Sequence, residues 1–371
     1  MKRIIIANDL LIGGGVENVL ENLVRYLMRQ GNEITLMLPD HTEEVQKIFG
    51  NDVKIYPMIR SLKKIKKYSL QWFWDRGLYV LQKQIYRIRF FFQQYDVLIA
   101  LKEGAIMKEV AGLYAKKKFA WVHADYNFMH WTKGYFHSDE DERKCMMKYD
   151  KVACVSEATR CSLIHTIGNP GNLCVKYNPI DYAKIRVNAL ETCPERKSSE
   201  GILYVSIGRL DYPKNYSLLL DVCNELTKHY PFELWIVGDG PERKELQEKI
   251  DSYGLNCVKL LGSKKNPFPY LEQADVFIST SMVESYGLAV QEALILGKPV
   301  IAVKCPAIEE NFDKHFGLLT EATYQSIKNA MECFLSAPEE IIRYRTEIRE
   351  HYKTDDLFET RLTEIERLWE I

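Results

Sequence analysis

Short apolar runs alternate with amphipathic segments along both halves of this chain, and this alternation is the feature that most restricts its fold. KRIIIAN (residues 2–8) is followed by a glycine loop, a helical pattern ending at Gly31 and a second run, EITLMLP. The second half repeats the pattern with GILYVSIGRL, FELWIVGDGP, VKLLG, DVFISTS and GKPVIAV. Strands that alternate with helices form parallel sheets covered by helices. The pattern predicts two doubly wound α/β domains facing a central cleft, with ligands at the carboxyl ends of the strands.

Composition limits the class of protein. A length of 371 residues suits two domains, and a net charge of -1 argues against a general polyanion binder. The nine cysteines include no CxxC pair, which predicts reduced, mostly buried thiols and no metal site. The start, MKRIIIANDL, has too short an apolar run for a secretory signal, and no uninterrupted apolar segment reaches membrane-spanning length. We therefore expect a cytoplasmic protein.

Three glycines, Gly13, Gly14 and Gly15, follow the first predicted strand. Without side chains they would let the backbone approach a ligand closely. Their spacing does not give GxGxxG, so a dinucleotide fingerprint is weakly supported. The alternative is that they only shape a tight turn.

The segment from Arg60 to Tyr95 is both basic and aromatic. Its cations are opposed only by Asp75, and they are Arg60, Lys63, Lys64, Lys66, Lys67, Arg76, Lys83, Arg87 and Arg89. Aromatic residues are interleaved with them: Trp72, Phe73, Trp74, Tyr79, Tyr86, Phe90, Phe91 and Phe92. Such a surface suits an anionic membrane, and the same pattern also occurs in nucleic-acid binding. A solvated helix face with inward-packed aromatics is the third interpretation. We expect a membrane surface in contact with residues 60–95 and no nucleic acid partner.

Candidate site residues follow predicted strands in both halves. His123 comes just after the strand FAWV, where a site residue of an open α/β sheet would project, although a structural histidine is the common alternative. His130 and His137 have weaker claims because they follow no clear strand. Arg209 and Lys214 follow the first strand of the second half and could clamp a diphosphate, or they are two solvated cations.

The stretch from Ser279 to Ala302 carries two carboxylates around a predicted helix. Ser281, Glu284 and Ser285 offer capping groups, and Gly297 with Lys298-Pro299 supplies a stop signal. We expect a helix of about three turns that begins just after Glu284, with Glu292 about two turns in. A helix start attracts phosphate, and carboxylates beside it accept hydrogen bonds from hydroxyl-rich groups such as ribose and a sugar. The alternative is an amphipathic surface helix with solvated acids. From the last short strand and turn, Val175–Asp181, the chain passes to a polar connector, Asn188–Gly201.

The motifs occur in an order that resembles a family 4 glycosyltransferase of the bacterial polysaccharide or lipopolysaccharide type. They are GGGVE, WVHADY, VSE, NPID, GRLDYPKN, IVGDGPE, LLGSKKNP, ADVFISTS and ESYGLAVQEAL with GKPVIA. The resemblance implies a GT-B fold of two Rossmann-like domains with a C-terminal helix that crosses back to the first. We place an acceptor-binding domain at residues 1–181 with a helix at about 355–371, and a nucleotide-sugar donor domain at 182–354.

The resemblance also implies roles for individual residues. Glu292 matches the acid that holds the donor ribose, and Glu284 matches the acid near the donor sugar. Arg209 and Lys214 match the pair that binds the diphosphate, and His123 matches the histidine that faces the transferred sugar. The remaining donor-binding positions are the glycine loop, the residue after the first acid, and the backbone amides at the helix start: Gly14, Gly15, Ser285, Tyr286, Gly287 and Leu288.

Family members retain anomeric configuration and usually need no bound metal, so the resemblance implies no cofactor and no dedicated nucleophile. It implies transfer of a hexose or N-acetylhexosamine from a nucleotide sugar, with UDP favoured over GDP, to a saccharide acceptor that we expect to be lipid-linked at the inner membrane face. Three departures from the family pattern are Asn18, Ser285 in place of a usual glycine, and CPAIEE after the late strand. Alternatives are a GT-B nucleotide-sugar epimerase and a non-catalytic nucleotide-sugar-binding protein; an NAD-dependent dehydrogenase is the least favoured.

Overall fold

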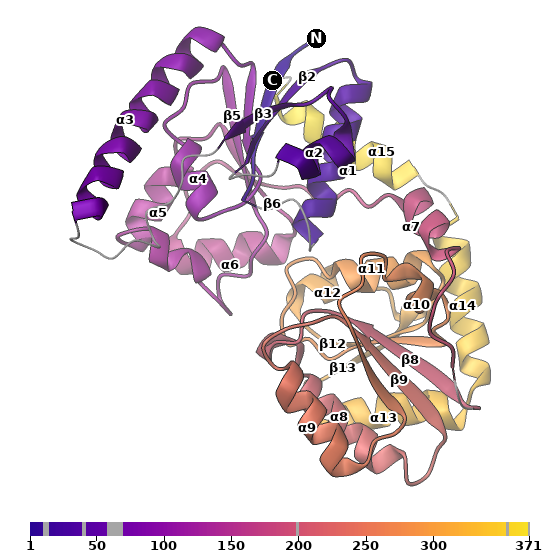
Figure 1. Cartoon of the computed structure of the whole chain (residues 1–371). Helices are drawn as coiled ribbons and strands as arrows, with labels where there is room; N and C mark the ends of the chain where they lie inside the picture. The colour runs from indigo at the N-terminus through magenta and orange to yellow at the C-terminus, as the bar shows by residue number, and fades with distance from the viewer. Residues whose placement is uncertain (10–14, 39–41, 58–69, 198–199, 354–355, 370–371) are drawn as a thin grey trace. The chain divides into compact units, whose positions relative to one another are not determined.

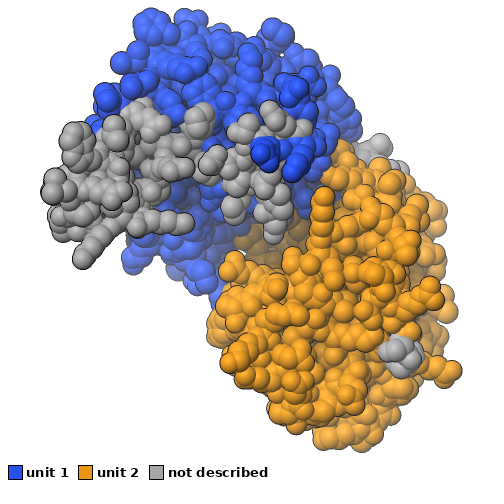
Figure 2. Space-filling model, viewed as in Figure 1, with its two compact units in different colours: residues 1–180, 359–371 blue, residues 181–358 orange. Residues whose placement is uncertain are grey.

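The computed structural model describes residues 1–9, 15–38, 42–57, 70–197, 200–353 and 356–369. It divides into two compact units, which Figure 2 distinguishes by colour. Unit 1 consists of Met1–Ile180 with Glu359–Ile371, and unit 2 is Asp181–Phe358. The chain therefore leaves unit 1 once and returns to it near the end.

Unit 1 is built on a parallel sheet whose seven described strands have the order β3-β2-β1-β4-β5-β6-β7 (Figure 1). The chain order reverses between β1 and β4, which places a topological switch point there. The inner strands β1 and β4 are apolar runs whose residues are nearly all buried, as expected for strands covered on both faces. The strands are β1 Arg3–Ala7, β2 Glu33–Leu38, β3 Lys54–Pro57, β4 Val97–Ala100, β5 Lys117–Val122, β6 Lys151–Cys154 and β7 Leu173–Val175.

Helical elements connect most of these parallel strands. The helix α1 buries an apolar face that includes Leu20, Leu23 and Leu27, and it carries Tyr26 toward the C-terminal segment. The helical elements are α1 Gly15–Arg29, α2 Thr42–Phe49, α3 Leu70–Gln93, α4 Ala105–Val110, η2 Trp131–Tyr135, α5 Asp139–Met146 and α6 Glu157–Ile167.

Unit 2 repeats the architecture with the strand order β10-β9-β8-β11-β12-β13 in its described part. Here β8 and β11 are neighbours, so the switch point lies between them. The strands are β8 Ile202–Ile207, β9 Phe232–Val237, β10 Val258–Gly262, β11 Val276–Ser279, β12 Val300–Val303 and β13 Gly317–Thr320. The helical elements are α7 Tyr182–Ala189, η3 Tyr212–Lys214, α8 Tyr216–Leu226, α9 Arg243–Tyr253, α10 Phe268–Glu272, α11 Leu288–Ile295, α12 Pro306–Glu310, η4 Lys314–Phe316, α13 Tyr324–Ser336 and α14 Glu339–His351.

The C-terminal segment, α15 (Asp356–Glu366) with η5 (Arg367–Trp369), packs on unit 1, and Figure 1 shows α15 beside α1. Tyr26 Oη donates a 2.9 Å hydrogen bond to Glu366 Oε2, and the rings of Phe119 and Trp369 lie 5.6 Å apart. Leu362 and Ile365 are buried. The predicted return of the C-terminal helix to the first domain is confirmed.

Most predicted strands are confirmed, with two local corrections. The short strand predicted at the start of Val175–Asp181 is present but lies earlier, because β7 is Leu173–Val175 and the polar residues that follow leave the sheet. Within the predicted connector, residues 188 and 189 instead complete α7, whose start is capped by Asp181. Among the described residues, no helix combines the length and the apolar character needed to cross a membrane.

Candidate active site

Two loops of unit 2 are tied together at the carboxyl edge of its sheet, one after β8 and one after β11. Thr280 Oγ1 donates a 2.7 Å hydrogen bond to the carbonyl oxygen of Lys214, and the Met282 amide donates a 2.8 Å bond to that of Pro213. Because β8 and β11 are adjacent parallel strands, both loops emerge at the switch point. The loops thus place residues that lie about 70 positions apart in sequence next to each other.

Lys214 and Glu284 form an ion pair in which Nζ lies 2.5 Å from Oε1. Their side chains are only 23% and 19% exposed. Burial by itself lowers the pKa of Lys214, but the charge and hydrogen bond of Glu284 outweigh it, so the pKa of Lys214 is raised. Lys214 is therefore a fixed cation. Two residues that the sequence assigned to one site are in direct contact.

Arg209 belongs to the same loop as Lys214 but is held differently. Its side chain is 71% exposed, and its Nε lies 3.5 Å from Asp211 Oδ2. The neighbouring turn after β9 packs against this loop backbone to backbone, since a Cβ on Gly238 would lie 1.9 Å from the Gly208 carbonyl oxygen. The turn after β9 therefore holds the backbone of this loop in place, while most of the Arg209 side chain is exposed to solvent.

The helix α11 begins later than the sequence suggested. It runs over eight residues, about two turns, from Leu288 to Ile295, so the expectation of three turns starting after Glu284 was wrong. Gly287 is the N-cap with φ 78°, and a Cβ there would lie 2.4 Å from Ile308 Cδ1. Ser281 is not a cap, because its hydroxyl donates to the carbonyl oxygen of Val283 at 2.8 Å.

This start of α11 leaves N–H groups for a ligand. Gly287 has no side chain to accept hydrogen bonds from the first turn, so the N–H groups of that turn are open to an acceptor from outside the helix. Tyr286 is buried, whereas Ser285 and Leu288 are partly exposed. Of the predicted donor-binding stretch, Ser285, Tyr286 and Gly287 form the turn before the helix, and Leu288 is the first helical residue.

Glu292 lies about one turn into α11 rather than the predicted two turns. Burial raises the pKa of its carboxyl group from 4.5 to about 8. Within the described part of the chain this carboxyl group has no hydrogen-bond partner. Carboxyl groups with a strongly raised pKa are concentrated at functional sites.

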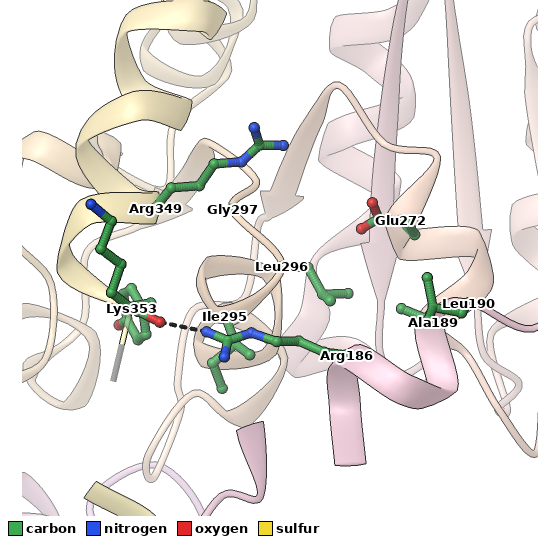
Figure 3. Close-up of a pocket in the computed structure, with 10 residues that line it drawn as sticks. Arg186, Ala189, Leu190, Glu272, Ile295, Leu296, Gly297, Arg349 and Lys353 are labelled. Atoms are coloured by element: carbon green, nitrogen blue, oxygen red, sulfur yellow. Dashed lines mark hydrogen bonds between the residues drawn. The ribbon is translucent and has the colours of Figure 1, made fainter. Parts of the chain in front are cut away.

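A cavity of about 410 Å³ opens at the opposite end of α11 (Figure 3). Its lining includes Ile295, Leu296 and Gly297, which end the helix, together with Arg349. Arg186, another lining residue, donates to the carbonyl oxygen of Tyr352. Since α11 is about 12 Å long, this cavity is separate from the Lys214–Glu284 pair.

In unit 1, His123 directly follows β5, as predicted. Its Nε2 is buried and has no hydrogen-bond partner among the described residues, and its ring stacks on Trp121 with 6.1 Å between ring centroids. Burial lowers the pKa of His123 to about 3, against a smaller opposing effect of the Leu101 backbone. The imidazole is therefore neutral. Gly15 is the first residue of α1, whereas Gly13 and Gly14 lie outside the described residues.

The sequence interpretation missed Glu103, which is 2% exposed and accepts a 3.0 Å hydrogen bond from the His123 amide. The available signal was that Glu103 follows the apolar run VLIAL. His123 follows the next strand at the equivalent position in the register that pairs β4 with β5. His130, by contrast, contacts the buried Glu142 at 2.7 Å, which is a structural role. The amide of His137 donates a 3.1 Å hydrogen bond to Asp141 in the first turn of α5.

Two parallel Rossmann-like sheets with a returning C-terminal helix define a GT-B protein. The sequence model of the family described as Glycosyltransferase Family 4 matches residues 13–184. The sequence model of the family described as Glycosyl transferases group 1 matches residues 192–352. Between them the two models cover most of the sequence. The chain belongs to this family of glycosyltransferases.

Similar proteins support the family assignment. An uncharacterized glycosyltransferase of Haemophilus influenzae is 24% identical over 336 residues, 88% of each chain. The N-acetylgalactosamine-N,N'-diacetylbacillosaminyl-diphospho-undecaprenol 4-alpha-N-acetylgalactosaminyltransferase of Campylobacter jejuni is 31% identical over 166 residues, 43% of this chain and 44% of that protein. The crystal structure of Anabaena HepE with UDP and glucose superimposes with a TM-score of 0.77 at 18% identity and covers all of both chains. For three further curated relatives, the match spans 27%, 28% and 30% of the relative's length.

Proposed function

We propose that this glycosyltransferase moves a hexose or N-acetylhexosamine from a UDP-sugar to a lipid-linked saccharide, with retention of configuration, in the synthesis of a cell-surface polysaccharide. The Lys214–Glu284 ion pair, next to the start of α11, carries the proposal. The pair brings together, at the carboxyl edge of the unit 2 sheet, a cation that would bind a diphosphate and a carboxylate that would accept hydrogen bonds from sugar hydroxyls.

The chemistry of transfer accounts for this arrangement. When the bond between the anomeric carbon and the diphosphate breaks, negative charge grows on the leaving group. Lys214, Arg209 and the first N–H groups of α11 would stabilise that charge without reorganising. We assign no metal and no other cofactor, because the chain supplies these cations and dipoles itself.

Other residues would hold the substrates. Glu292 would accept hydrogen bonds from the ribose hydroxyls, and Glu284 from the donor sugar. His123, being neutral, would contribute a hydrogen bond rather than a charge to the transferred sugar. The leaving phosphate would take the proton of the acceptor hydroxyl, so no side chain is assigned as nucleophile.

Two relatives motivate the finer parts of the proposal. HepE was solved with UDP and glucose, which favours a UDP-linked donor here. The Campylobacter jejuni enzyme is named for a diphospho-undecaprenol acceptor, which favours a lipid-linked saccharide. With such an acceptor, we propose that the reaction takes place at the inner face of the membrane.

A turnover assay tests the proposal. We expect the purified protein to hydrolyse slowly one of the common UDP-hexoses or UDP-N-acetylhexosamines, and to transfer its sugar when a diphospho-lipid saccharide is supplied. The product anomer, read by NMR, should match the donor. A protein that neither hydrolysed nor transferred from any common UDP- or GDP-sugar would contradict the assignment, and an epimerised free donor would identify the alternative reaction.

We further propose that α3 rests on the membrane that carries the acceptor (Figure 1). Leu81, Ile85, Ile88 and Phe92 are 58%, 51%, 59% and 76% exposed, and their spacing of four, three and four residues puts them on one helix face. The opposite side is anchored by Phe90, which is fully buried. The cations Arg60, Lys63, Lys64, Lys66 and Lys67 lie outside the described residues, but Arg87 and Arg89 are exposed on α3 itself.

Replacing Ile85 and Ile88 together by aspartate should abolish most vesicle binding, because each change removes an apolar anchor worth about 1 kcal/mol or more and adds repulsion from anionic lipid. The measurement is flotation with phosphatidylglycerol-containing vesicles at low salt. Hydrolysis of the soluble donor should be unchanged. Ile342→Asp is the matched control, since Ile342 is 68% exposed on α14 of unit 2. If the unaltered protein does not float, α3 is not a membrane surface.

A further inference from the structure

Two buried carboxylates of unit 1, Glu103 and Glu142, have no part in the transfer chemistry proposed above. They are 2% and 0% exposed, and both bind the segment that follows β5. Glu142 accepts a 2.8 Å hydrogen bond from Tyr126 Oη and contacts His130 Nε2 at 2.7 Å. Glu103, in contrast, contacts His123 and Trp131. Of the two acids, Glu103 is the one bonded to His123.

Each oxygen of Glu103 accepts one hydrogen bond from the loop after β5. Oε2 accepts from the His123 amide at 3.0 Å, and Oε1 accepts from Trp131 Nε1 at 3.0 Å. Burial raises the pKa of Glu103, and these two bonds with the nearby Lys102 oppose that rise. A buried carboxylate that makes two hydrogen bonds to one loop fixes the loop's position.

The packing next to Glu103 restricts Trp131 further. Gly104 has φ 79°, and a Cβ on it would lie 3.1 Å from the Trp131 ring and 3.2 Å from Thr132. Lys102 Nζ lies 5.5 Å from the centre of the Trp131 ring and 3.2 Å from Asp9, which follows β1. The loops after the adjacent strands β1, β4 and β5 are thus joined in one chain of contacts that ends at His123.

We propose that Glu103 is a positioning residue for His123: by holding the His123 amide and the Trp131 indole, it fixes the imidazole at the carboxyl edge of the unit 1 sheet. This inference rests on the proposed function, in which His123 contacts the transferred sugar. Small displacements of a group that contacts reacting atoms lower turnover strongly, while binding of the nucleotide by residues of unit 2 is little affected.

The test compares Glu103→Gln with the matched variant Glu142→Gln. A glutamine at 103 offers one acceptor and one NH₂ group, so one of its two N–H partners meets a donor instead of an acceptor. We expect kcat for donor hydrolysis and for transfer to fall about ten- to hundredfold, with KM for the nucleotide sugar within about twofold. Glu142→Gln should lower the melting temperature to a similar extent but leave kcat within about threefold.

A double variant distinguishes the positioning of His123 from the loss of the carboxylate at residue 103. In Glu103→Gln/Trp131→Phe the indole donor is gone, so the amide can present its oxygen to the His123 amide. We expect this variant to have a kcat equal to or higher than that of Glu103→Gln alone. A kcat that falls by the product of the two single effects would overturn the proposal.

The remaining outcomes are also decisive. If Glu103→Gln is folded and active at the wild-type kcat, or if both glutamine variants lose kcat equally, Glu103 has only a structural role. If Glu103→Gln does not fold, Trp131→Phe alone should lower kcat about threefold or more, and a wild-type kcat there would overturn the proposal. If the unaltered protein turns over no nucleotide sugar, the proposed function fails first and this inference fails with it.

Discussion

Lys214→Ala should lower kcat for sugar transfer about 10²- to 10³-fold, the range found when one preorganised group that stabilises a developing anion is removed. Lys214 is a fixed cation whose position is set by Glu284, so a diphosphate that leaves the sugar meets a charge already in place. Steady-state kinetics with the identified donor, together with calorimetric titration of UDP, would separate the loss in turnover from the loss in binding.

Lys249→Ala is the matched control for this prediction. Lys249 also belongs to unit 2, its side chain is 20% exposed, and its Nζ lies 2.8 Å from Asp221 Oδ1. Both variants delete one lysine from a partly buried ion pair, but only Lys214 lies at the loop after β8 that we assign to the donor. Lys249→Ala should keep kcat within about twofold. Equal losses in the two variants would show that ion-pair deletion, and not leaving-group stabilisation, explains the effect.

The second large effect is expected for Glu292. Glu292→Ala should weaken UDP binding about ten- to hundredfold, because it removes hydrogen bonds to a charged acceptor. The carboxyl group has a pKa of about 8 because it is buried, so it is mostly protonated at pH 7 without ligand. Ribose hydroxyls that donate to it favour the ionised form. UDP binding should therefore release a proton, and the affinity should rise as the pH increases toward 8.

The stability of the folded protein should fall as the pH rises, whereas the affinity for UDP should increase. The folded protein keeps this proton between pH 4.5 and about 8, whereas an unfolded chain loses it near 4.5, so the stability that is present at low pH is lost as the pH rises through that window. Glu292→Gln has no such proton to lose. Its melting temperature should therefore fall less between pH 6 and 9 than that of the unaltered protein, and its UDP affinity should lack the extra pH slope. If the melting temperature and the UDP affinity depended on pH identically in both proteins, the proposed role of Glu292 would be contradicted.

The sequence predicted the sheet architecture because each inner strand is a continuous apolar run whose pattern is local. It did not predict the edge strands β3 and β13, because KIYP and GLLT lack the continuous apolar run that marks inner strands of the same length, such as β4 and β12. The start of α11 was misplaced for a related reason. Ser281, Glu284 and Ser285 all offer capping groups, whereas the N-cap is Gly287, whose positive φ and close approach to Ile308 cannot be read from the local sequence.

The candidate site likewise contains residues that the sequence could indicate and one that it could not. Arg209, Lys214, Glu284 and Glu292 could be proposed from the sequence because they stand in motifs, and the contact of Lys214 with Glu284 agrees with that grouping. Glu103 was missed because its importance depends on burial and on Trp131, which lies 28 residues further along the chain. No local pattern can indicate such a pairing. Most of the cations that suggested a membrane surface lie outside the described residues, so that prediction still depends on the exposed face of α3.

The return of residues 359–369 to unit 1 has a consequence for biosynthesis. Leu362, Ile365 and Trp369 are buried against a sheet whose strands come from the first half of the chain. On a ribosome, unit 2 is complete before these residues emerge, so it can fold while the apolar surface around Tyr26 and Phe119 is still uncovered. The unit that is translated first is therefore completed last, because residues 359–369 supply part of its buried apolar surface.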